Sequence, residues 1–201
     1  MSSQRHHLSE ETLASIGAKK QPVSYQEENL AYIIKLYPTN PTNHLSKAIE
    51  INGAVDENAL SISVAKIIEL NPSLRSFYQL NPSLEKYEVP ADFNPKNFSP
   101  LENFSTPQLD IIDIKDQDKA AQKQKLEQVL AKPYSIHEFP LMRAHLIKVA
   151  DTKSYLVLSM SHMVGDGYSA FLVFGLVECI YNFIVKPIPD TNKEYLNKVL
   201  S

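Results

Sequence analysis

The stretch Ser159-Met160-Ser161-His162-Met163-Val164-Gly165-Asp166-Gly167-Tyr168 decides the fold, because a strand pattern ends in it and a helix pattern begins in it. The apolar run 155–158 precedes it, and an apolar helical pattern over 171–183 follows it. Two glycines flank Asp166, as expected where a backbone turns sharply or passes close to another group. We therefore expect His162 at the end of a buried strand, on a tight turn that presents its side chain to solvent.

The composition indicates a soluble globular protein. Apolar residues make up 43% of the 201 residues, and the net charge is −3. Lysine and arginine are scattered, which argues against a nucleic-acid partner. The single cysteine, Cys179, excludes an internal disulfide and a multi-cysteine metal site, and we expect no metal. No stretch has the length of a membrane span, and the N-terminus lacks the apolar centre of a signal peptide, so we expect a cytoplasmic protein without membrane contact.

Helix and strand patterns fill most of the chain. Ser24-Tyr25-Gln26-Glu27 is a capping box and predicts a helix that ends at Pro38. Asp56 is predicted to cap a second helix, and further helices are predicted over 116–131 and 168–184. Strands are predicted over 44–51, 74–78, 109–114, 141–149 and 154–161, and residues 150–153 between the last two suit a hairpin. This pattern favours one mixed or mainly antiparallel sheet with helices packed on it. We expect residues 1–20 to form a flexible arm, 21–186 one domain, and 187–201 a tail or connector.

The last predicted helix carries an apolar stripe that we expect to face the core. Because Cys179 falls on this stripe, we interpret it as a small core residue rather than a nucleophile. The stripe comprises Phe171, Leu172, Gly175, Leu176, Cys179, Ile180 and Phe183.

Residues 161–167 resemble the HHxxxDG motif of the condensation domains of nonribosomal peptide synthetases and their acyltransferase relatives. Other family segments have counterparts here in the same order, and together they span roughly residues 22–185. These counterparts are Ser24-Tyr25-Gln26, Glu50-Ile51-Asn52-Gly53, Leu74-Arg75-Ser76-Phe77, Pro133-Tyr134 and Pro140-Leu141-Met142-Arg143-Ala144.

The resemblance implies a chloramphenicol-acetyltransferase-like lobe, an α/β (α+β) two-layer sandwich with a mixed, mainly antiparallel sheet. It implies that the second motif histidine, here His162, is catalytic and points into a channel where a thioester-bound acyl group meets an amine or alcohol. It also implies that Asp166 points away from this channel and pairs with Arg143, which fixes the turn. Gly167 would let substrate and backbone approach closely.

The chemistry of the residues agrees with this interpretation. A neutral histidine suits proton abstraction from an attacking amine or hydroxyl. The chain has no GxSxG motif, which favours direct transfer over an acyl-enzyme. Whether His162 takes the proton or only positions the reactants stays open, and the alternative is a histidine that merely ends a strand. Further candidates for the substrate channel are Ser161, Gly165, Ser169 and Tyr25.

Two departures from the family pattern bear on activity. Ser161 replaces the first motif histidine, although related acyltransferases carry HxxxD without it. The family's complete unit has two lobes, and the second lobe with its DFG-type motif has no counterpart here. The chain is therefore expected to need a second lobe, to self-associate as single-lobe chloramphenicol acetyltransferases do, or to act as a non-catalytic module that binds a carrier protein or another lobe. The donor would be a carrier-protein or CoA thioester with its own phosphopantetheine arm, and no tightly bound cofactor is implied.

Overall fold

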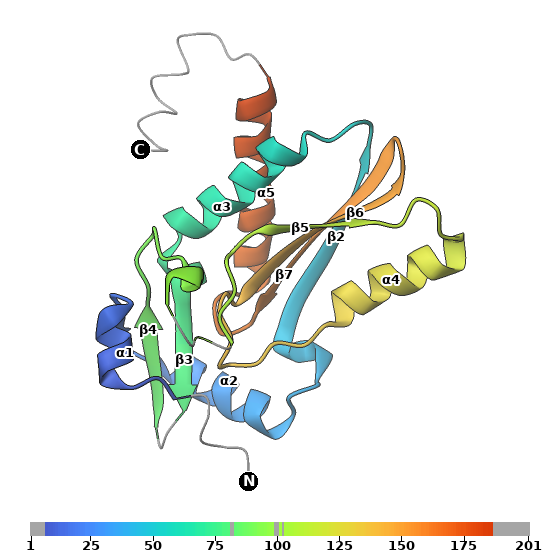
Figure 1. Cartoon of the computed structure of the whole chain (residues 1–201). Helices are drawn as coiled ribbons and strands as arrows, with labels where there is room; N and C mark the ends of the chain where they lie inside the picture. The colour runs from blue at the N-terminus through green and yellow to red at the C-terminus, as the bar shows by residue number, and fades with distance from the viewer. Residues whose placement is uncertain (1–6, 81–82, 99–100, 102, 187–201) are drawn as a thin grey trace.

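The computed structural model describes residues 7–80, 83–98, 101 and 103–186. Two β-sheets and five α-helices make up this part of the chain (Figure 1). The predicted tail, residues 187–201, lies outside the described residues.

The larger sheet has four strands in the order β2-β7-β6-β5. Pairing is antiparallel for β2 with β7 and for β6 with β7, and parallel for β5 with β6. Its strands are β2 (His44–Asn52), β5 (Leu109–Asp113), β6 (Met142–Ala150) and β7 (Lys153–Ser161). The mixed, mainly antiparallel character predicted from the sequence is confirmed, including the hairpin that joins β6 to β7, but the strands form two sheets and not the single sheet that was expected.

Helices cover both faces of this sheet, because its strands alternate between two apolar faces. Leu156 and Leu158 of β7 pack in one core cluster with α3 (Glu57–Leu70) and α5 (Gly167–Val185). Val157, between them, packs in another cluster with α4 (Lys119–Ala131). In Figure 1, α4 accordingly lies on the opposite side of the sheet from α3 and α5.

A second sheet of three antiparallel strands lies near the end of the larger one. Its order is β1-β4-β3, with β1 (Lys19–Gln21), β3 (Ser76–Leu80) and β4 (Leu84–Glu88). Helices α1 (Glu10–Ser15) and α2 (Tyr25–Leu36) lie beside it (Figure 1). Short 3-10 helices at Pro41–Asn43, Pro72–Arg75 and Pro95–Asn97 complete the described elements.

The predicted flexible arm is wrong over its described part. Ser9 caps α1, whose Leu13 is buried, and Ile16 just after it is 2% exposed. Both side chains pack against Phe77 and Tyr87 of the smaller sheet. The sequence allowed a short helix capped by Ser9 through Leu13 and Ile16, which is confirmed. It did not reveal the packing of this helix, because β1 is three polar residues long and is defined by its pairing with β4.

The predicted buried face of the last helix is also wrong, except at Ile180. The buried side chains of α5 are Val173, Phe174, Val177 and Ile180, whereas Phe171, Leu172, Leu176 and Cys179 are exposed. A helix that is apolar all round carries no periodic signal for the side that packs, so contacts with the sheet and α3 decide it. Contrary to the expectation from sequence, α5 has the length and composition of a membrane-spanning helix. One face of α5 packs on the sheet and on α3, whereas only 22% of the membrane-length window of this helix is buried.

Candidate functional site

The motif forms a tight turn between β7 and α5. The backbone N–H of His162 donates to Asn43 O at 3.1 Å, and the N–H of Val164 donates to Ser161 O at 3.1 Å. Ser161 is fully buried, and its Oγ accepts a hydrogen bond from Met163 N at 3.3 Å. The serine at the first motif-histidine position therefore closes the turn and does not line the depression next to His162.

The ring of His162 is half-buried and lines an open depression of about 600 Å³. Among the described residues, no side-chain hydrogen bond or ion pair engages the ring. The start of α2 forms the opposite wall, so two segments far apart in sequence enclose the histidine. The depression is lined by Ser24, Gln26, Glu27, Asn29, Leu30, His162, Met163, Gly165, Asp166 and Ser169.

The candidate channel residues differ in their placement. Gly165 and Ser169 line the depression with His162. Tyr25 is 77% exposed and lies outside that lining. A Cβ atom at Gly165 would lie 2.9 Å from Met160 Sδ, whereas one at Gly167 would meet no atom within 4 Å. Within this chain the close contact is therefore at Gly165, and the approach of a substrate to the backbone at Gly167 stays a prediction.

Asp166 caps the N-terminus of α5. Its Oδ1 accepts hydrogen bonds from Ser169 N and Ser169 Oγ, both at 2.8 Å. These bonds lower the pKa of the exposed carboxyl group below its ordinary value. The side chain fixes the first turn of the helix next to His162.

The expected pair between Arg143 and Asp166 is absent from the structure. Arg143 Nη2 instead lies 2.6 Å from Glu138 Oε1 and donates to Pro133 O at 3.0 Å, and its guanidinium group stacks on Tyr134, 3.9 Å from the ring centroid. Burial raises the pKa of Glu138, and the nearby arginine opposes that rise.

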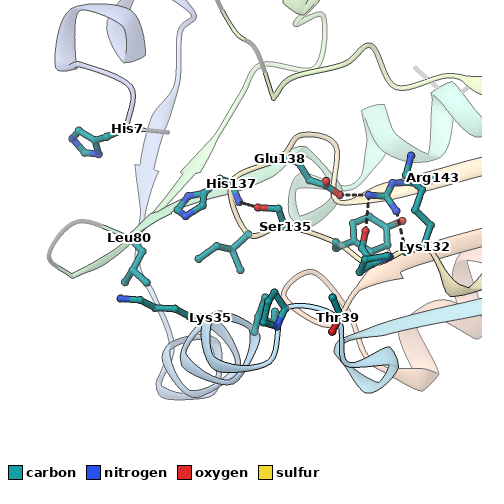
Figure 2. A pocket seen from close by; sticks show the side chains of 14 residues that line it. His7, Lys35, Thr39, Leu80, Lys132, Ser135, His137, Glu138 and Arg143 are labelled. Atoms are coloured by element: carbon teal, nitrogen blue, oxygen red, sulfur yellow. Dashed lines mark hydrogen bonds and ion pairs between the residues drawn. The ribbon is translucent and has the colours of Figure 1, made fainter. Parts of the chain in front are cut away.

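The alternation of β6 explains the difference. Met142 and Ala144 on either side of Arg143 pack toward α3 and α5, so Arg143 points to the other face of the sheet. There it lines a separate cavity of about 650 Å³ between α2 and residues 132–138 (Figure 2).

A network that the sequence did not reveal holds the motif turn from the smaller sheet. Tyr78 of β3 is 1% exposed, and its hydroxyl lies 2.9 Å from Met163 O and 2.7 Å from Glu27 Oε1. Lys86 Nζ donates to the same carboxylate oxygen at 2.8 Å. We call Tyr78, Glu27 and Lys86 the Tyr78 network. The hydroxyl of a buried tyrosine needs a hydrogen-bond partner. A tyrosine in a predicted strand was thus the one signal in the sequence that pointed to such a network.

Glu27 is ionised within this network. Burial alone would raise its pKa, but hydrogen bonds from Lys86, from the backbone N–H of Ser24 and from Tyr78 outweigh burial and lower the pKa to about 2. Glu27 also completes the predicted capping box, because its Oε2 accepts from Ser24 N at 2.7 Å. In the described part of the chain, no group of three His, Cys, Asp or Glu side chains could hold a metal ion.

Comparisons with known proteins agree on one family. A family model described as "Condensation domain" matches residues 18–196. A linear gramicidin synthase protein of Brevibacillus parabrevis is 25% identical over 173 residues, which is 84% of this chain and 3% of that protein. Bacitracin synthase 2 of Bacillus licheniformis is 24% identical over 177 residues, 87% of this chain and 6% of that protein. The chain thus spans a few per cent of these curated relatives.

Solved structures show the same fold. A variant of the starter condensation domain of rhizomide synthetase RzmA, in complex with C8-CoA, has a TM-score of 0.69 at 18% identity, covering 88% of this chain and 38% of that chain. The first condensation domain of the CDA synthetase has a TM-score of 0.67 at 16% identity, covering 85% of this chain and 42% of that chain.

Proposed function

Because this chain belongs to the condensation-domain family, we propose that it supplies one wall of an acyl-transfer site. The acyl group would pass from a thioester, borne by a carrier protein or by CoA, to an amine or a hydroxyl group. The observation that carries this proposal is the unengaged ring of His162, which faces an open depression at the end of a buried strand.

The reaction needs little from the protein beyond a placed acceptor for one proton. The attacking nitrogen or oxygen forms a bond to the thioester carbonyl carbon, a ring nitrogen of His162 accepts its proton or orients it, and the carbon–sulfur bond breaks. The thiolate leaves and takes up a proton, so the products are an amide or ester and a free thiol. A neutral imidazole near physiological pH can play either part.

The donor in this proposal carries a phosphopantetheine arm, and no tightly bound cofactor is required. Support comes from the RzmA starter domain, a relative in fold of which a variant is described in complex with C8-CoA. Carrier-bound and free CoA thioesters present the same arm to the protein. The cytoplasmic location expected from the sequence is part of this proposal.

A second protein surface would complete the site. The depression at His162 is open, and beside it the uncovered face of α5 exposes Tyr168, Phe171, Leu172 and Leu176. Contiguous exposed apolar side chains of this kind mark interaction surfaces. The partner would be a second lobe of the same kind or another copy of this chain.

The same uncovered face of α5 supports an alternative function. A lobe that binds a carrier protein or another lobe through this face would need no catalytic histidine. The two functions differ in what His162 contributes, because only the enzyme needs its ring.

An assay of thiol release separates these functions. The mass of the chain in solution is measured first, and the protein is then incubated with C8-CoA and a panel of amine acceptors, alone and with candidate partner lobes. We expect thiol release above background that His162→Gln abolishes while binding of the partner or thioester is retained. Equal thiol release by the wild type and His162→Gln would contradict the enzymatic function. Binding of the partner or thioester without thiol release in every assembly would favour the binding module.

A further inference from the structure

The turn that carries His162 is held by a hydroxyl group from the other sheet. Tyr78 lies in β3 of the smaller sheet, whereas Met163 follows β7 of the larger one. The Tyr78 hydroxyl bonds to the carbonyl oxygen of Met163, the residue that directly follows His162. The side chain of Met163 is 3% exposed and packs in the same core cluster as the Tyr78 ring.

The hydroxyl is itself fixed by charge. It has one proton and two acceptors, the carboxylate of Glu27 at 2.7 Å and the carbonyl of Met163 at 2.9 Å. Lys86 binds the same carboxylate oxygen, so the carboxylate cannot rotate away without losing an ion pair. The hydroxyl shares its one proton between the carboxylate and the carbonyl oxygen, and the ion pair with Lys86 keeps the carboxylate in this geometry.

We infer that Tyr78 is a positioning residue for His162. Its hydroxyl sets the height of the turn above α2, and with it the direction in which the imidazole enters the depression. Glu27 serves both sides of the site, since it also lines that depression. This inference rests on the proposed role of His162 in acyl transfer and adds the group that aims it.

The test is a pair of matched tyrosine variants in the whole chain. Tyr78→Phe removes the hydroxyl at the turn. The control, Tyr87→Phe, removes a hydroxyl on the neighbouring strand β4, where Tyr87 donates to Glu85 of the same strand at 2.9 Å. Histidine ring resonances are recorded by NMR in protein with labelled histidine, and the His162 signal is identified by its loss in His162→Gln. Amide hydrogen exchange is measured at His162 and Val164.

In Tyr78→Phe we expect the His162 ring signal to move and the two amides to exchange about tenfold faster, as when one buried hydrogen bond is lost from a local opening. Tyr87→Phe should leave both unchanged. A folded Tyr78→Phe protein with the His162 signal and exchange rates of the wild type would overturn the inference. If Tyr78→Phe does not fold, Glu27→Gln decides: a smaller change of the same signals supports the inference, and no change overturns it.

A kinetic measurement separates this inference from the proposed function. In an assembly that transfers acyl groups, Tyr78→Phe should lower kcat and leave KM unchanged, because the misaimed ring affects the reaction and not thioester binding. Transfer by the wild type with unmoved His162 signals in Tyr78→Phe would overturn the inference and leave the function intact. If the His162 signals move in Tyr78→Phe but the wild type transfers no acyl group in any assembly, the result would support the positioning of the turn by Tyr78 and contradict the proposed acyl transfer.

Discussion

Glu27 Oε1 lies 2.8 Å from Lys86 Nζ, so the first turn of α2 is ion-paired with β4 across 59 residues of sequence. Both side chains are mostly buried, and Glu27 lines the depression at His162. The site therefore depends on a charge whose state can be changed with pH.

Stability should fall as the pH is lowered from about 4.5 to about 2, in part because of Glu27. The pKa of this carboxyl group is about 2 in the folded protein, against an ordinary value of 4.5. A carboxyl group whose pKa is lowered by folding stabilises the protein above its ordinary pKa, and this contribution is lost as the pH falls through the folded value. Glu27→Gln should lower the free energy of unfolding at pH 7, and most of this difference should vanish near pH 2 in urea titrations followed by circular dichroism.

Glu28 provides the matched control, because it is exposed in the same first turn of α2. Glu28→Gln should leave the pH profile close to that of the wild type. Identical pH profiles of the unfolding free energy for the two variants would show that the hydrogen bonds and the ion pair of Glu27 do not lower its pKa.

Two phenylalanines on α5 test which face of this helix is buried. Phe174 is 6% exposed and Phe171 is 63% exposed. Phe174→Ala should cost about 3–5 kcal/mol of unfolding free energy through loss of core packing, whereas Phe171→Ala should change it by no more than about 0.5 kcal/mol. Chemical denaturation of both variants measures this difference, and equal costs would contradict the orientation of the helix.

Double-mutant cycles test the partner of Arg143. Arg143→Met combined with Glu138→Gln should show a coupling energy of about 0.5–3 kcal/mol, because the two side chains are in contact. Combined with Asp166→Asn, the effects should be additive to within about 0.5 kcal/mol. Coupling to Asp166 in place of Glu138 would restore the pairing that the family resemblance implied.

Restoring the first motif histidine should destabilise the protein. Ser161 is fully buried, so Ser161→His must displace its neighbours at a cost of about 1–3 kcal/mol. Ser161→Ala should cost about 1 kcal/mol, because only the bond to Met163 N is lost. A histidine variant as stable as the wild type in thermal unfolding would show that the turn has room for the larger ring.

The sequence was informative wherever the determining contacts are local. The capping box at Ser24 and the cap at Asp56 were found correctly, because a cap joins residues three positions apart. The hairpin β6–β7 was found because two strand segments flank a short polar turn. The turn that places His162 next to solvent follows from the same local pattern.

Contacts between distant segments were missed or misassigned. The buried face of α5 depends on α3 and the sheet, and the apolar sequence of α5 permits several orientations. The ion pair of Arg143 was transferred from a family pattern, although the alternation of Met142 and Ala144 around it already placed it on the other face. The hydroxyl of Tyr78 meets a carbonyl 85 residues away, which no local spacing can indicate.

The bond between β3 and the motif turn also bears on how the protein opens. Proteins unfold locally in cooperative units, and residues that share a tertiary contact tend to be lost together. The contact between Tyr78 and Met163 places the motif turn in the same unit as the three-stranded sheet. Partial opening of that sheet would thus release the motif turn and the orientation of His162 while the hydrogen bonds of the four-stranded sheet are still intact.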